Sequence, residues 1–387
     1  MITNNITNAL LGGIEQKSPQ VDSQNLEAYL ASIGKAEKDL EKIDPAIALI
    51  DKQPADSEIL AMVANHQKQV VQSMVSGNPE DAIALALAAS IEVYSAQLEA
   101  IEQQTKGLGA FEDAMEVMWE DISKTSPLTG YALEDAFQLV LMDVLIHPDD
   151  YNLTPAEQNT LQRFMECGGS GMHGSHENYD QNEFVRDVAK LFNTIYAQAP
   201  EGSLAHTITQ SMKNESGCPE ALVKQFEDNW GNAVDWNNDW NNGTGEISPV
   251  MRMAILSSVL GDESIELTTE EYNLLLTGSL SEVDDFIQDK YGKSTIEYIN
   301  QDLDKWNYHY DPNEDTGVGY GMNFWSSDGM TVDYFTELSE NLPARPLTDE
   351  ELKEINRIGD QVKMLQQTLK YWLQICRDEQ MSIARNI

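Results

Sequence analysis

The sequence predicts a mainly α-helical protein with a mixed α/β insertion. Apolar residues recur every three or four positions toward both ends of the 387-residue chain, a spacing typical of amphipathic helices. Between about residues 148 and 346 this periodicity weakens, and that stretch holds most of the glycines and five of the seven tryptophans. We therefore expect an N-terminal helical hairpin, a long intramolecular antiparallel coiled coil and an inserted α+β domain.

The N-terminal part of the chain is expected to hold a leader and the hairpin. Residues 1–23 carry no charge before Glu15 and lack the basic start of a cleavable secretory signal. They predict a flexible leader for export. A helical pattern then runs over residues 24–106, with interruptions at Asp44-Pro45 and at Gly77-Asn78-Pro79. These breaks predict a helical hairpin in which the segments pack on one another.

The C-terminal segment, residues 347–387, has the clearest helical pattern. Thr348 and Glu351 form a capping box, and apolar residues then alternate at spacings of three and four, as in a coiled-coil seam. The predicted seam consists of Ile355, Ile358, Val362, Leu365, Leu369, Trp372 and Cys376. An isolated amphipathic helix is barely stable in water, so this seam needs a partner helix.

Residues 107–147 are the predicted partner of that seam. They read as one long helix, broken or kinked at Pro127. Their apolar face is expected to hold Met115, Met118, Ile122, Phe137, Val140 and Val144. We therefore predict that 107–147 and 347–387 form the central coiled coil and bracket the inserted domain at 148–346.

The inserted domain is expected to contain helices and short strands. Helical spacing predicts helices at Pro155 to Met165 and at Asn182 to Ala197. Short runs of β-branched and aromatic residues predict strands at Gly317 to Phe324 and at Thr331 to Phe335. This combination gives the mixed α/β character of the insertion.

The charge of the chain restricts its partners. Twenty-four Lys and Arg residues face 65 Asp and Glu residues, for a formal net charge of −41. Such a surface repels phosphate backbones and anionic lipid headgroups, so we expect no nucleic-acid partner. The longest apolar run is shorter than a transmembrane helix requires. The three cysteines are far apart in the sequence and predict no disulfide framework.

One acidic loop has the ligand spacing of a calcium site. Oxygen-bearing side chains at Asp235, Asn237, Asp239 and Glu246 occupy loop positions 1, 3, 5 and 12 of an EF-hand pattern. Trp240 stands at position 6, where that pattern requires glycine. The alternative, which this departure favours, is a polar turn anchored by its tryptophans. Beyond this calcium candidate the sequence predicts no cofactor.

Two further segments have compositions that suit binding or catalysis. The segment from Cys167 to His176 places a thiol, His173 and His176 in a glycine-rich loop, which could hold a metal or form a flexible linker. The aromatic residues between 306 and 335 suit either a binding surface or core packing. We find no nucleophile-elbow, zinc-protease, phosphate-loop or dinucleotide motif, so the chain is predicted not to be an enzyme.

The order of these segments resembles the needle-tip, or hydrophilic translocator, proteins of bacterial type III secretion systems. The uncharged leader, the hairpin and the C-terminal run from Ile355 to Ile387 are similar to the same parts of that family. So is Met118-Trp119-Glu120-Asp121-Ile122, followed by Tyr131 and Phe137. The insertion is larger and richer in tryptophan than the family pattern, and the chain is unusually acidic.

The resemblance implies a protein that is made in the cytoplasm, secreted, and placed at the needle tip on the bacterial surface. It implies as partners the needle subunit, two membrane translocators, other copies of the chain, and in some members bile salts. The hairpin would act as a self-chaperone that covers the coiled coil before export. Two alternatives are an exported effector with an enzymatic or host-binding domain at 148–346, and a cytoplasmic gatekeeper or chaperone.

Overall fold

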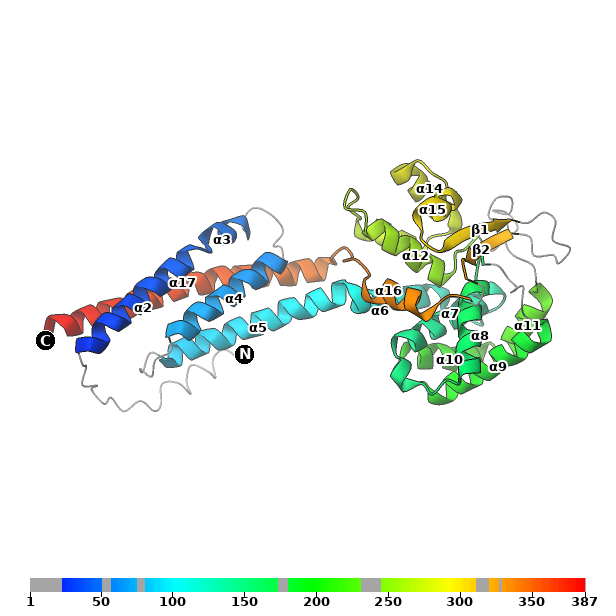
Figure 1. Cartoon of the computed structure of the whole chain (residues 1–387), viewed down its shortest axis with the longest axis horizontal. Coiled ribbons are helices and arrows are strands. Elements are labelled where there is room, and N and C mark those ends of the chain that lie inside the picture. The colour runs from blue at the N-terminus through cyan, green and yellow to red at the C-terminus, as the bar shows by residue number, and fades with distance from the viewer. Residues whose placement is uncertain are drawn as a thin grey trace. The chain divides into compact units, whose positions relative to one another are not determined.

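The protein is mainly α-helical and carries a small two-stranded antiparallel sheet (Figure 1). The helical part of the predicted fold class is therefore confirmed. The computed structural model of the chain describes residues 23–50, 57–74, 81–172, 180–230, 245–310, 320–326 and 329–386. The predicted leader thus lies outside the described residues. Contacts divide the chain into two compact units, residues 1–99 with 349–387 and residues 100–348.

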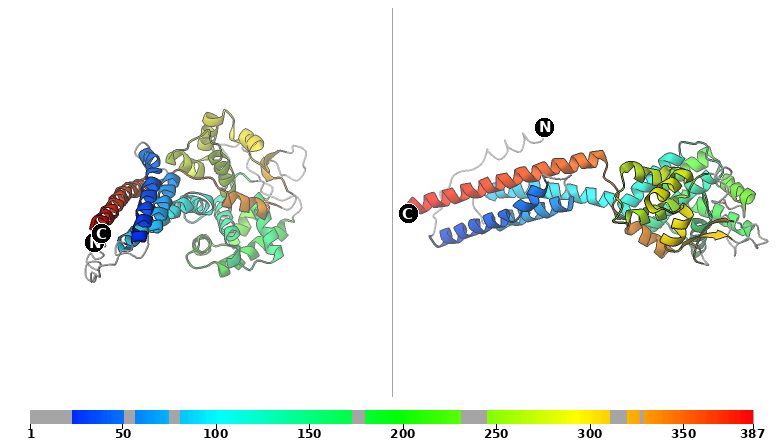
Figure 2. Two further views of the ribbon diagram at one scale, coloured as in Figure 1. Left: turned by 60° about the vertical axis from the view of Figure 1, so that its left-hand side comes forward. Right: turned by 90° about the horizontal axis from the view of Figure 1, so that it is seen from above.

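The first unit joins helices from the two ends of the chain. It contains α2 (Ser23–Glu41), α3 (Asp44–Ile50), α4 (Ser57–Met74), most of α5 (Asp81–Thr105) and α17 (Asp349–Asn386). The N-terminal helix α2 packs against both α4 and α17, and α4 also packs against α17 (Figure 2). The predicted interruption at Asp44-Pro45 is confirmed as the boundary between α2 and α3.

The predicted seam of α17 is buried, but its predicted partner is wrong. All seven seam residues are buried, and α2 and α4 cover the helix. Two buried glutamines join these elements. The Gln67 amide donates to Gln366 Oε1 at 3.1 Å, and the Gln366 amide donates to the Leu40 carbonyl at 3.0 Å. The heptad spacing predicts that one face is buried, but it does not specify which helix covers that face.

The second unit contains the remaining elements. Its first part holds α6 (Gly107–Ile122), α7 (Tyr131–Ile146), a short 3-10 helix η1 (Pro148–Asp150), α8 (Pro155–Cys167), α9 (Gln181–Gln198), α10 (Leu204–Glu215) and α11 (Glu220–Asn229). Its second part holds α12 (Pro249–Leu260), α13 (Thr269–Thr277), α14 (Leu280–Tyr291), α15 (Thr295–Asp302), β1 (Trp306–Tyr310), β2 (Tyr320–Phe324) and α16 (Val332–Glu340). The helices predicted at 155–165 and 182–197 correspond to α8 and α9 and are confirmed.

Residues 107–147 form two separate helices, α6 and α7, which pack on each other, and the predicted break at Pro127 lies between them. Every residue from Leu133 to Val144 is buried, so α7 has no single exposed face and cannot serve as one side of a coiled coil. Phe137 lies in an aromatic core, with its ring centroid 5.0 Å from that of Phe164 and 5.6 Å from that of Phe192. The apolar residues predicted for 107–147 therefore belong to the core of the second unit: Met115, Met118, Phe137, Val140 and Val144 are buried and Ile122 is half-buried.

The strand predictions were partly right. Strands β1 and β2 pair antiparallel, with Trp306 opposite Phe324 and Tyr308 opposite Met322. The strand predicted near 317–324 is thus β2, whereas residues 317–319 lie outside the described part of the chain. The strand predicted at 331–335 is wrong, because this segment begins α16. The Thr331 hydroxyl accepts the Tyr334 amide at 3.3 Å as an N-cap, and this cap outweighs the local β propensity.

Candidate functional site

Helix α7 presents three buried polar side chains that hold one glycine-rich loop. Glu134 Oε2 accepts the Gly169 amide at 2.8 Å. The carboxylate of Asp135 accepts the Ser170 amide at 2.7 Å and the Ser170 hydroxyl at 2.6 Å. Gln138 donates to the Gly168 carbonyl at 3.0 Å. The side chains of α7 therefore fix the path of residues 168–170.

Gly169 is required in this loop for two reasons. Its φ of +104° lies in a region that residues with a side chain rarely adopt. A Cβ at this position would also lie 2.9 Å from both Asp135 Oδ1 and the Ser248 Cβ. The close approach brings the backbone of the loop within hydrogen-bonding distance of the two carboxylates.

The same contacts position the start of α12. The Val250 amide donates to Gln138 Oε1 at 2.9 Å, and the Ser248 amide donates to the Ser170 carbonyl at 2.9 Å. These two bonds satisfy backbone groups at the N-terminus of α12 that have no partner within the helix. Arg252 follows within the first turn, so its position depends on α7 and on the 168–170 loop.

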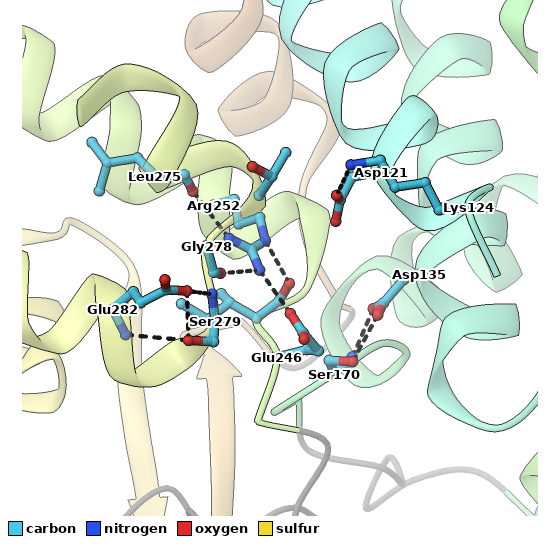
Figure 3. A network of polar contacts seen from close by, with 12 residues as sticks. Asp121, Lys124, Asp135, Ser170, Glu246, Arg252, Leu275, Gly278, Ser279 and Glu282 are labelled. Carbon is cyan, nitrogen blue, oxygen red and sulfur yellow. Dashed lines mark hydrogen bonds and ion pairs between the residues drawn. The ribbon is translucent and has the colours of Figure 1, made fainter. Parts of the chain in front are cut away.

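Arg252 is a buried arginine, only 5% exposed, at the centre of a polar network (Figure 3). Its Nε donates to the Ile247 carbonyl at 2.9 Å, and Nη1 donates to the Leu275 carbonyl at 3.2 Å. Its Nη2 donates to the Gly278 carbonyl at 2.8 Å and to Glu246 Oε2 at 3.2 Å. Leu275 and Gly278 end α13, so the guanidinium caps the carbonyl end of that helix, where positive charge is stabilising.

A cavity of about 400 Å³ lies beside this arginine. We call it the Arg252 cavity. Its polar lining consists of Arg252, Asp121, Asp135, Glu246, Ser170, Thr125, Thr129 and Tyr131. The rest of its lining consists of Met118, Ile122, Gly130, Ala132, Ile247, Pro249 and Leu276. Its volume is within the range of small-molecule sites, and such sites combine apolar walls with a few convergent polar groups.

The carboxyl groups near the cavity have altered acidities. Burial raises the pKa of Asp135 to about 7, although the hydrogen bonds from Ser170 and the charge of Arg252 act in the opposite direction. Burial likewise raises the pKa of the neighbouring Glu134 to about 8, against the hydrogen bonds from Gly169 and Gln225. Burial also raises the pKa of Glu246 above its ordinary value, although the charge of Arg252 opposes this shift. The site therefore changes its charge near neutral pH.

We expect Glu134 to make the protein less stable as the pH rises. The native state binds a proton on this carboxyl that the unfolded state releases above its ordinary pKa of 4.5. The contribution to stability is therefore fully present at low pH and is lost between 4.5 and about 8. The slope is about 1.4 kcal/mol per pH unit for one group. Glu134→Gln should remove this slope, because an amide can accept from Gly169 and donate to a rotated Gln225.

Urea unfolding of the wild type and of Glu134→Gln at several pH values between 5 and 9 would measure this effect. The control is Glu350→Gln, at a side chain that is 83% exposed, and it should keep the slope of the wild type. Parallel pH profiles for wild type and Glu134→Gln would show that Glu134 does not hold its proton in the folded protein.

The predicted calcium ligands do not form a site in the described part of the chain. Asp235, Asn237 and Asp239 lie outside the described residues. Glu246 is described, and its carboxylate pairs with Arg252. Among the residues that the structure describes, no group of three or more His, Cys, Asp or Glu side chains is arranged to hold a metal ion. Calcium binding at 235–246 remains an untested prediction.

The cysteine and aromatic candidates belong to the core where they are described. Cys167 is buried and its thiol pKa is raised by burial, which disfavours a thiolate nucleophile. His173 and His176 lie outside the described residues. Trp306 is buried and donates to the Tyr334 hydroxyl at 2.8 Å. Trp325 differs, because 78% of its surface is exposed.

The sequence did contain a signal for the residues that were missed. Glu134, Asp135 and Gln138 interrupt an otherwise apolar helix, and Arg252 stands in the apolar run PVMRMAIL. Charged residues are rarely buried unless they are paired. Polar residues inside a continuous apolar stretch therefore indicate a buried network, although not the partners within it.

Comparison of the chain with models of protein families, with curated proteins and with solved structures finds no match. Among the described residues, no helix is both long enough and apolar enough to span a bilayer. The function therefore has to be argued from the residues and their arrangement.

Proposed function

We propose that the chain is a needle-tip, or hydrophilic translocator, protein of a type III secretion system. It would be exported from the cytoplasm to the needle tip on the bacterial surface. There it would contact the needle subunit, further copies of itself and the membrane translocators, and so assist effector delivery. It would act through these contacts and not as an enzyme.

The observation that carries this proposal is the covering of the C-terminal helix by the N-terminal helices. The buried seam of α17 packs on α2 and α4 within one unit, and the unit of residues 100–348 is inserted between these two ends of the sequence. An N-terminal cover over an amphipathic C-terminal helix is what a self-chaperone requires. The covering helices α2 and α4 belong to the predicted hairpin at 24–106, and on α17 they take the place that the sequence predicted for 107–147.

The Arg252 cavity favours a second candidate, an exported effector with a host-binding or enzymatic domain. The sequence predicted that domain at 148–346, whereas the residues that line the cavity extend from 118 to 276 within the second unit. Such a protein would carry a ligand site in the inserted unit, and an aspartate with a pKa of about 7 is a suitable proton acceptor near neutral pH. The two candidates differ in where the protein acts and in whether other effectors depend on it.

Deletion of the gene is expected to block delivery of every effector into host cells. Antibody labelling of intact bacteria should find the protein at needle ends. A reporter fusion to an unrelated effector measures delivery, and complementation with the intact gene is the control. If delivery of that reporter continues in the deletion strain and the protein is found inside host cells, the effector candidate replaces the needle-tip proposal.

A further inference from the structure

We propose that the Arg252 cavity binds an aliphatic ammonium group, with the charged nitrogen among its carboxylates and the hydrocarbon chain against its apolar wall. This inference does not depend on the proposed secretion function, because it rests on the second unit alone. It assigns a ligand class to a cavity whose lining comes from α6, α7, α12 and α13 and from the loops at 123–130, 168–170 and 245–247.

Most of the charged side chains that line the cavity are carboxylates. Arg252 is influenced by four carboxylates, Glu246, Asp135, Asp121 and Glu282. The positive groups near them are Arg252 and Lys124, whose ammonium pairs with Asp121 at 2.7 Å from a side chain that is 73% exposed. Three of these carboxylates, Asp121, Asp135 and Glu246, line the cavity together with Arg252. Above a pH of about 7, where Asp135 is ionised, the lining therefore carries more negative than positive charge. A cation is favoured over an anion at such a place.

Arg252 has little capacity left for an anionic ligand. A guanidinium has five N–H donors, and four of them already bind the carbonyls of Ile247, Leu275 and Gly278 and the carboxylate of Glu246. The arginine therefore serves to hold Glu246 and the end of α13 in place. An anion would have to displace these bonds and would also meet the nearby carboxylates.

The lining of the cavity is also partly apolar, and its buried polar groups are held in place. Met118, Ile122, Ile247 and Leu276 supply an apolar wall next to the carboxylates. The lining residues Ser170, Asp135 and Arg252 are buried and hydrogen-bonded, so little reorganisation is needed on binding. A cation with a short hydrocarbon chain matches both the polar and the apolar lining, whereas an inorganic cation would leave the apolar wall unused.

Isothermal titration at low salt with three probes of equal length tests the proposal. We expect n-hexylammonium to bind the full-length protein with a dissociation constant of about millimolar or tighter. Hexanoate and 1-hexanol should not bind measurably under the same conditions. A pentapeptide with a central lysine and blocked ends distinguishes a free amine from the lysine of a protein partner, since tighter binding of the peptide would indicate the latter source.

Two substitutions at the rim should change the affinity in opposite directions. Asp121→Asn should weaken hexylammonium binding about fivefold, whereas Lys124→Gln should strengthen it, because Lys124 competes for the same carboxylate. Asp360→Asn is the matched control, since its side chain lies on α17 and is 81% exposed, and it should leave the affinity unchanged. Asp121 and Lys124 are partly or largely exposed, so neither change should prevent folding.

The proposal is overturned if hexanoate or hexanol binds as well as hexylammonium, or if no probe binds. It is also overturned if Asp121→Asn and Lys124→Gln leave the affinity of hexylammonium unchanged, because binding would then occur elsewhere. Ammonium-selective binding that shifts in opposite directions in the two variants supports the assignment to this cavity.

Discussion

Replacement of Leu369 by aspartate is expected to unfold the helical unit that α2, α4 and α17 form. Leu369 is fully buried in the seam of α17. An aspartate there would place a charge without a partner among apolar side chains and would remove a buried leucine. Such a change costs about 3 kcal/mol or more, a large share of the stability of a typical domain.

Circular dichroism during thermal unfolding would measure this loss as a lower midpoint and a smaller helical signal at 25 °C. The matched control is Met364→Asp on the same helix, because Met364 is 61% exposed and its replacement leaves the seam intact. The control should unfold like the wild type. If Leu369→Asp and Met364→Asp had equal midpoints, the seam would not be the interface that holds α17 to α2 and α4.

Replacement of Arg252 by methionine is expected to destabilise the second unit by about 3 kcal/mol or more, because each buried acceptor that loses its donor costs about 1 kcal/mol or more. Methionine fills a similar volume but donates no hydrogen bond. Three backbone carbonyls, those of Ile247, Leu275 and Gly278, would lose a donor. Glu246 would lose its positive partner, and Asp135 would lose a compensating charge.

Urea unfolding followed by tryptophan fluorescence would measure this effect. Arg357→Met is the matched control, because Arg357 is about half exposed and pairs with Glu354 on its own helix, a contact worth about 1 kcal/mol or less. The loss of stability in Arg252→Lys should lie between those of Arg252→Met and Arg357→Met. An ammonium group keeps the charge, but it lacks the planar guanidinium geometry that reaches three carbonyls. A loss for Arg252→Met no larger than that of Arg357→Met would contradict the network described here.

Local signals in the sequence were enough to predict several elements. Helical spacing predicted α8 at 155–165, and apolar residues at spacings of three and four predicted the buried face of α17. Both signals depend on neighbours within one or two helical turns. For the same reason the sequence predicted a mainly helical protein and the boundary at Asp44-Pro45 without knowledge of any distant contact.

The contacts between distant elements are seen only in the folded structure. The apolar face of a helix does not specify which helix will cover it, so α17 could have packed on any helix of similar length. In the structure it packs on α2 and α4. The composition of residues 331–335 favours a strand, but the N-cap at Thr331 and the packing in the second unit make this segment the start of α16. The Arg252 cavity draws Asp135, Ser170 and Glu246 from distant parts of the chain. Whether such residues form hydrogen bonds and are buried together depends on how close they lie in space. Their spacing along the sequence does not give that distance.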